Sequence, residues 1–233
     1  MRIQNIGSRA VSVRPSCGKE LVERGVEIAN VYIGAFGEAP WYEKLLVRID
    51  GKWRRAGTED ELQQVALLRA KGALDEKDIQ PFYTVCAVVE EIKRSSLANG
   101  FAASIAICGS QTDGMVVGVS WGMLAQAIPV DEKLRDVELI IRDRGLRPER
   151  TFYFDETFVD VGYRGLKIGR DLVRVRRRMA IEIGCTFAIV RTMNPIQVNN
   201  LTSVFGIGNV VEVYSNPHDI QADRRYYLIR LGE

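Results

Sequence analysis

The sequence predicts an α/β (α+β) protein with a mixed central sheet of about six to seven strands flanked by helices. Three observations support this fold class. Residues 154–191 read as a strand, a glycine-containing turn, a helix and a second strand, which is the order of a parallel β-α-β unit. Residues 101–124 have the pattern of a hairpin, and apolar runs at 209–214 and 224–231 supply two further strands.

The N-terminal part is predicted to form a strand followed by a helix. Residues 10–14 alternate between apolar and polar side chains, and Pro15 ends the run, which is typical of an edge strand. Apolar residues then recur at helical spacing over 20–36, until Gly37 interrupts the pattern. We therefore expect one helix between the first strand and residue 37.

Residues 43–98 are interpreted as helices inserted ahead of the central sheet. Residues 58–61 resemble a capping box, and a helical period follows them until Gly72. A second helical pattern follows Pro81. No repeat or low-complexity linker separates this stretch from the rest. We therefore predict one domain over 1–233 with a helical insertion at about 43–98.

The strand before the turn is expected to alternate its side chains between the two faces of the sheet. One face would carry Phe154, Glu156 and Phe158, and the other Asp155, Thr157 and Val159. A charged connection is expected at 131–150, and a short helix at 194–205.

Composition narrows the class of protein. The chain has 233 residues, of which 46% are hydrophobic and 27% charged, as in an ordinary soluble globular protein. A formal net charge of +2 gives no reason to expect a nucleic acid partner, and no apolar run is long enough to span a membrane. No signal-peptide core follows Met1, so a cytoplasmic protein is expected.

Histidine and cysteine are too sparse for two familiar kinds of active site. Cys17, Cys86, Cys108 and Cys185 form no CxxC pair, and the only histidine is His218. A typical zinc site is therefore not expected, and a hydrolase triad would need His218 as its sole base. We expect no metal, and we interpret His218 as a loop residue.

The turn before the helix carries the clearest functional signal. Its backbone N–H groups would point toward one place at the positive end of a helix, where a phosphate group is favoured. The turn resembles the acetyl-CoA-binding loop of the GNAT acetyltransferase superfamily, whose pattern is Arg or Gln, two residues, Gly, one residue, then Gly or Ala. The pattern falls on Arg164, Lys167 and Gly169, so a lysine occupies the first glycine position.

The resemblance covers residues 8–40 and 99–231 and is weakest over 43–98. It implies the GNAT fold, with acetyl-CoA as the cosubstrate. Backbone groups of Phe158 and Val159 would pair with the pantetheine arm. The N–H groups of the turn would hold the pyrophosphate, and they belong to Arg164, Gly165, Leu166, Lys167, Ile168, Gly169 and Arg170.

Two of these positions have alternative interpretations. Lys167 either adopts a helical φ and lends its ammonium to the phosphates, or crowds the site. Asn194 lies where family members often use an Asn to bind pantetheine or to order the next helix. It is equally typical of a helix N-cap, because Pro195 follows it at the favoured first position.

Four arginines of the helix are predicted to lie opposite its apolar stripe. They are Arg170, Arg174, Arg177 and Arg178. A charge run on a helix is usually a solvated face, and for Arg170 contact with a phosphate is the alternative. Arg177 and Arg178 are expected to be solvated.

Two carboxylates are the candidate catalytic residues. An amine must lose a proton before it attacks a thioester. Glu156 occupies a position where many superfamily members carry a carboxylate, and Asp155 is the second candidate for this base. The alternative is that both are exposed at a sheet edge. The tyrosine that often acts as general acid in the family has no counterpart at Leu201 or Thr202, so the general acid is unassigned.

Together these inferences describe an N-acetyltransferase that transfers the acetyl group of acetyl-CoA to a primary amine by direct attack in a ternary complex. The amine acceptor, a small molecule or a protein amine, is not readable from the sequence. Lys167 and the missing tyrosine suggest an alternative, which is a non-catalytic acyl-CoA-binding or regulatory domain of the same fold. An enzyme of this fold that takes a longer acyl chain is a third interpretation, and a homodimer is left open.

Overall fold

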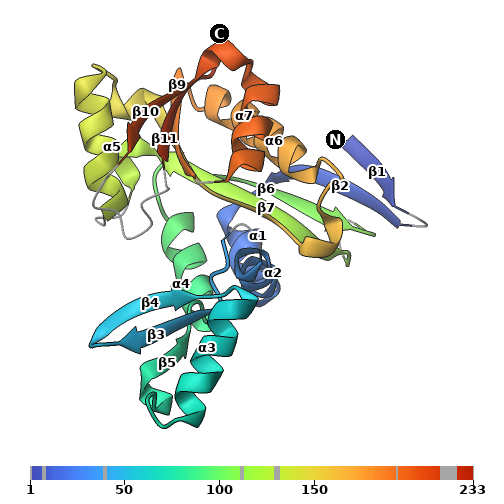
Figure 1. Ribbon diagram of the computed structural model, residues 1–233. Coiled ribbons are helices and arrows are strands. Elements are labelled where there is room, and N and C mark those ends of the chain that lie inside the picture. Colours follow the sequence, from blue (N-terminus) through green and yellow to red (C-terminus); the bar gives the residue numbers. More distant parts are fainter. Residues whose placement is uncertain are drawn as a thin grey trace.

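The computed structural model describes residues 2–6, 9–38, 41–110, 113–128, 132–192, 194–215 and 225–232. Its centre is an eight-stranded sheet in the order β1-β2-β6-β7-β8-β9-β11-β10 (Figure 1). The strands are β1 (Arg2–Ile6), β2 (Arg9–Ser16), β6 (Ala102–Cys108), β7 (Met115–Leu124), β8 (Thr151–Val159), β9 (Phe187–Thr192), β10 (Val210–Ser215) and β11 (Arg225–Arg230). The β8–β9 pair is parallel, and the other neighbours in the sheet are antiparallel. The predicted mixed sheet is confirmed, with β1 as an additional strand.

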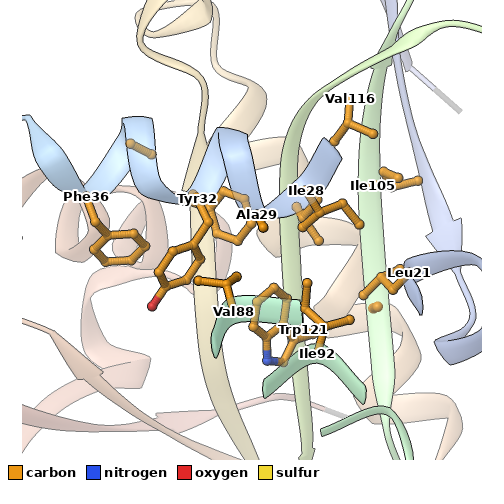
Figure 2. Close-up of a cluster of buried hydrophobic side chains, with 14 of the residues drawn as sticks. Leu21, Ile28, Ala29, Tyr32, Phe36, Val88, Ile92, Ile105, Val116 and Trp121 are labelled. Carbon is orange, nitrogen blue, oxygen red and sulfur yellow. The ribbon is translucent and has the colours of Figure 1, made fainter. Parts of the chain in front are cut away.

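Helices cover both faces of this sheet. One face is packed by α1 (Gly18–Glu23), α2 (Gly25–Gly37), α4 (Val85–Ser96) and α5 (Glu132–Asp143). The other is packed by α6 (Ile168–Glu182) and α7 (Pro195–Phe205). The strands alternate accordingly, because Ile105 of β6 packs toward α2 whereas its neighbour Ala106 packs toward α6. Figure 2 shows the core on the α2 face, where Tyr32 and Phe36 lie above Trp121 of β7.

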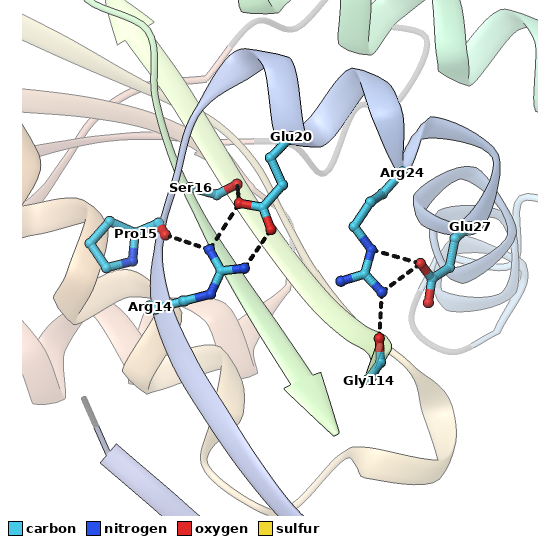
Figure 3. Close-up of polar contacts among 7 residues, drawn as sticks. All are labelled: Arg14, Pro15, Ser16, Glu20, Arg24, Glu27 and Gly114. Carbon is cyan, nitrogen blue, oxygen red and sulfur yellow. Dashed lines mark hydrogen bonds and ion pairs between the residues drawn. The ribbon is translucent and has the colours of Figure 1, made fainter. Parts of the chain in front are cut away.

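The N-terminal helix is broken where the sequence predicted one continuous helix. Arg24 separates α1 from α2, and its side chain bonds to Glu27 and to the carbonyl of Gly114 (Figure 3). Glu27 also accepts a hydrogen bond from Val116 N at 2.7 Å. Polar contacts therefore fix α2 against the start of β7, and this contact sets its position over the sheet.

Pro15 does not end β2, as the sequence suggested, but lies within it. Strand β1 pairs with β2 only as far as Val13, whereas β6 pairs with it through Ser16. Pro15 therefore lies where β2 has a strand neighbour on one side, and this local edge tolerates a residue without an N–H group. Similarly, the charged connection expected at 131–150 contains the helix α5.

The insertion contains a small sheet in addition to helices. Strands β3 (Leu45–Ile49), β4 (Lys52–Ala56) and β5 (Ile79–Pro81) pair in the order β4-β3-β5, and α3 (Glu59–Ala70) packs beside them. The capping box at the start of α3 is confirmed, since Thr58 Oγ1 accepts from Glu61 N and Glu61 Oε2 accepts from Thr58 N. The description of the insertion as helical is therefore incomplete. Its hairpin turns at Asp50 and Gly51, whose φ values are 50° and 75°.

A β-bulge in β8 changes which side chains share a face. Trp121 of β7 lies opposite Glu156 and Gly122 opposite Phe154, so Asp155 is an extra residue in β8. A Cβ on Gly122 would lie 2.2 Å from the Tyr153 carbonyl oxygen, so this register requires glycine. The predicted alternation is therefore wrong beyond Phe154, which packs on the α6 side although Phe158 packs on the α2 side.

Two further observations concern the whole described part of the chain. None of its helices combines the length and the apolar character that a membrane span requires. Among the described residues, no three His, Cys, Asp or Glu side chains come together as a metal site would need. His218 lies outside the described residues.

Candidate functional site

Two cavities lie where β8 and β9 part. The parallel pairing joins Thr151–Phe154 to Phe187–Val190, and β8 then continues to Val159 without further pairing to β9 in the described structure. One cavity has a volume of about 320 Å³ and the other about 270 Å³. They adjoin, because five residues line both, namely Phe36, Trp41, Thr157, Asn194 and Gln197.

The smaller cavity, here called the loop cavity, is lined mainly by β8 and the start of α6. The structure brings together the predicted cofactor residues Phe158, Val159, Arg164, Gly165, Lys167, Ile168, Gly169, Arg170 and Asn194. Leu166 is the exception, because it packs against the core under α6. The turn that leads into the cavity begins at Asp160, whose carboxylate accepts from Gly162 N at 2.8 Å.

The N-terminus of α6 gives the loop cavity its electrostatic character. The first hydrogen bond of this helix runs from Asp171 N to Lys167 O, so the N–H groups of Ile168, Gly169 and Arg170 have no acceptor in the helix. Arg170 Nε is also buried without a hydrogen-bond partner among the described residues. Unsatisfied donors at the positive end of a long helix favour an anion.

Lys167 has a backbone conformation that the sequence did not predict. It is the N-cap of α6, with φ 61° and ψ 9°, which is left-handed rather than the right-handed helical conformation. Glycine adopts this region without steric cost, whereas a lysine in it has a conformational free energy that is higher by roughly 1 kcal/mol. Its side chain is exposed at the rim of the loop cavity.

Arg164 and Asn194 tie the loop cavity to its surroundings. Arg164 Nη2 donates to the carbonyl of Ala35 at 2.7 Å, which joins the turn to the end of α2. Asn194 Oδ1 accepts from Ile196 N at 2.9 Å, so the predicted N-cap of α7 is confirmed. Because Asn194 also lines both cavities, its amide lies at their junction.

The larger cavity, here called the aromatic cavity, holds both predicted catalytic carboxylates. The bulge turns Asp155 and Glu156 toward the same cavity, so the expectation that they lie on opposite faces is wrong. Asp155 Oδ2 accepts from Trp121 Nε1 at 3.2 Å. Neither carboxylate lies at an exposed sheet edge, since both are half-buried in a central strand.

A buried arginine that the sequence interpretation missed holds the bulge from the other face. Arg176 is fully buried and donates from Nη1 to the carbonyls of Trp121 at 2.6 Å and Glu156 at 2.8 Å. Its Nη2 donates to Thr157 Oγ1 at 2.9 Å, and its guanidinium lies 4.1 Å from the ring centre of Phe154. Burial lowers its pKa to about 9, although the two nearby carboxylates act in the opposite direction.

The other arginines of α6 differ in environment. Arg177 donates to the carbonyls of Val204 and Leu231, so the prediction that it is solvated is wrong. Arg178 is exposed, as predicted. Arg174 pairs with the buried carboxylate of Asp171 at 2.8 Å.

The sequence analysis also did not identify two tyrosines that line the aromatic cavity, Tyr32 and Tyr83. Tyr83 donates from its hydroxyl to Glu43 Oε2 at 2.7 Å, and its ring packs edge-on against that of Tyr32, with ring centroids 5.0 Å apart. Glu43 is buried, with Arg55 at 3.9 Å. Burial raises the pKa of both tyrosines above the ordinary value, so they remain neutral phenols near neutral pH.

Of the comparisons with known proteins, only the one with solved structures found matches. No protein-family model matches the chain, and no curated protein matches it in sequence. PH1933 from Pyrococcus horikoshii OT3 superimposes with a TM-score of 0.51 at 12% identity, over 95% of this chain and 100% of that one. The PaiA N-acetyltransferase from Thermoplasma acidophilum, in complex with coenzyme A, gives 0.47 at 11% identity over 94% and 98%. The yncA protein from Salmonella typhimurium, with its cofactor acetyl-CoA, gives 0.48 at 12% over 96% and 95%.

At such low identity the likeness concerns the fold alone. The chain order of β8, a turn, α6 and β9, with β8 and β9 parallel, is the order that the sequence predicted. Over nearly the whole of both chains, this chain therefore shares the overall fold of PH1933.

Proposed function

We propose that this protein is a GNAT-type N-acetyltransferase that transfers the acetyl group of acetyl-CoA to a primary amine in a ternary complex. The observation that carries the proposal is the junction of the two cavities. Thr157 and Asn194 line both, so a thioester bound along the loop cavity would face an amine in the aromatic cavity. Bringing both reactants to one junction supplies the proximity that direct transfer needs.

The residues of the loop cavity fit coenzyme A. The pyrophosphate would accept hydrogen bonds from the free N–H groups at the start of α6, and Arg170 Nε is a buried donor beside them. The pantetheine arm would lie along Phe158 and Val159, on the side of β8 that has no strand neighbour in the described structure. Bound acetyl-CoA would supply the activated acyl group.

Glu156 is our candidate for the base that takes a proton from the incoming ammonium. Its neighbour Thr157 lines the junction, so the carboxylate lies on the acceptor side of it. Asp155 is engaged by Trp121 Nε1, which suits a residue that orients the ammonium. In the transfer the amine nitrogen bonds to the acetyl carbon, the carbon–sulfur bond breaks, and the thiol of coenzyme A is released.

The direct test measures how fast the protein releases the coenzyme A thiol from acetyl-CoA in the presence of each of a panel of primary amines. We expect release above the rate of hydrolysis with at least one amine, and the acetylated product by mass spectrometry. A protein that binds acetyl-CoA but releases no thiol with any amine would instead be the non-catalytic binding domain. Lys167 at the first glycine position is the observation that favours this second function.

A further inference from the structure

The aromatic cavity has a composition unlike that of the loop cavity. Six aromatic side chains line it, from α2, β7, β8, the segment before the insertion and the insertion itself: Tyr32, Phe36, Trp41, Tyr83, Trp121 and Tyr153. Several are packed against one another, with ring centroids 5.0 Å apart for Tyr32 and Tyr83, and 5.3 Å for Phe36 and Trp41. Such walls favour flat apolar groups and cations.

The charges of the cavity wall are mainly negative. Asp155 and Glu156 are neighbours in sequence of Thr157, which lines the junction with the loop cavity. Glu91 lines the same cavity from α4, but its carboxylate is paired with Arg94. Arg191 is the basic residue among those that line the wall. Three carboxylates and one guanidinium therefore line the cavity, which favours a cation.

Tyr83 and the start of α4 form another part of the wall. Tyr83, Ala87 and Val88 line the aromatic cavity and do not line the loop cavity. The hydroxyl of Tyr83 is already engaged by buried Glu43, so its ring forms a fixed part of the wall. The volume of about 320 Å³ is at the lower end of the range for small-molecule pockets, so the occupant is small.

These features assign an orientation and a chemical class to the occupant. We propose that the aromatic cavity takes a compact primary monoamine with an aromatic or bulky apolar body. Its ammonium lies beside Asp155 and Glu156, and its body packs against the aromatic walls, which include the ring of Tyr83. The proposal rests on the proposed function only in calling this ligand the acetyl acceptor, because the binding itself follows from the walls and charges of the cavity.

The test begins with binding to the unmodified protein. By calorimetry, 2-phenylethylamine should bind at least about tenfold more tightly than 2-phenylethanol, which has the same shape without the charge, or than 3-phenylpropionate, which has the opposite charge. Spermidine and a lysine-containing peptide serve as the polycationic and macromolecular alternatives. Preference for either of these over 2-phenylethylamine, or equal binding of the amine and the alcohol, would overturn the proposal.

A variant then tests the role of the aromatic wall. Tyr83→Ala should enlarge the cavity, so that 4-phenylbutylamine gains on 2-phenylethylamine by about tenfold in relative affinity. Tyr214→Ala, a half-buried tyrosine of β10 that does not line the cavity, is the matched control and should not change the ratio. An unchanged ratio in Tyr83→Ala with folding intact would refute the placement of the amine's body against Tyr83.

The outcome also separates this inference from the proposed function. Acetyl transfer to spermidine or to the peptide, without binding of 2-phenylethylamine, would support the proposed function and refute the inferred acceptor class. Binding of 2-phenylethylamine at the cavity without acetyl transfer to any amine would support the inferred binding site and refute the proposed function.

Discussion

The loop cavity and the aromatic cavity adjoin, but they are built in different ways. The loop cavity takes its character from backbone N–H groups of one continuous segment, which runs from β8 into the first turn of α6. The aromatic cavity takes its character from side chains that come from α2, from the C-terminal part of the insertion and from three strands of the main sheet. The first kind of site follows from local conformation, and the second depends on how distant elements pack.

The largest expected effect concerns the chemistry of the aromatic cavity. Glu156→Gln should lower kcat/KM on the order of 10²–10⁴-fold at neutral pH, because the variant lacks the carboxylate that we propose as the base for the ammonium. The loss should shrink at high pH, where the amine loses its proton unaided. The affinity for acetyl-CoA, measured by calorimetry, should not change. Activity within a few-fold of the native protein at every pH would transfer the role to Asp155 or to a water.

A second variant tests whether side-chain packing holds the aromatic cavity. Arg176→Met fills a similar volume but leaves the acceptors at Trp121, Glu156 and Thr157 without their donor. Since buried unsatisfied acceptors cost on the order of 1–3 kcal/mol each, we expect a loss of about 3 kcal/mol in the free energy of unfolding by urea. Arg178→Met, on the exposed side of the same helix, is the control. Equal stability of the two variants would mean that the bulge does not depend on Arg176.

The third prediction concerns the backbone-built site. Gly169→Asp places a negative charge at the start of α6, and its Cβ would lie 3.3 Å from Asn200 Nδ2. Repulsion of the pyrophosphate by about 2 kcal/mol would weaken acetyl-CoA binding by about thirtyfold. Gly208→Asp, where an added Cβ meets nothing within 4 Å, controls for the added charge. Unchanged affinity in the Gly169 variant would place coenzyme A elsewhere.

The smallest effect is expected at Lys167. Lys167→Gly removes the cost of a left-handed lysine and should stabilise the protein by about 1 kcal/mol. Asp50→Gly, at another positive φ in the hairpin of the insertion, should stabilise it similarly without touching either cavity. If the lysine attracts the pyrophosphate, Lys167→Gly should lose a little acetyl-CoA affinity, and Lys167→Glu should lose more, especially at low salt. A large gain in affinity for Lys167→Gly would instead show that the lysine obstructs the loop cavity.

The sequence was informative where structure is decided locally. The strand, turn and helix around Gly169 have signals within a few residues, so the order of these elements along the chain and most of the lining of the loop cavity could be predicted. The hairpin of the insertion also had a local signal, the Asp50-Gly51 pair, which the interpretation of 43–98 as helical did not use.

Non-local features could not be predicted in this way. The bulge at Asp155 depends on Gly122 in the partner strand, and no pattern within β8 reveals it. Arg176 stands in a run of arginines, so charge alone does not separate it from Arg178. Its spacing of three and four residues from buried Val173 and Ala180 was the available sign that it faces the core.

Glu43 and Tyr83 meet although they are far apart along the chain. They are 40 positions apart, and the stretch between them folds around its own small core of Val47, Ala56, Val65 and Leu74. The intervening residues can therefore be exchanged or recombined while the contact between Glu43 and Tyr83 is retained. In evolution or in protein engineering, this arrangement lets one module diversify without any change to the residues that line the loop cavity.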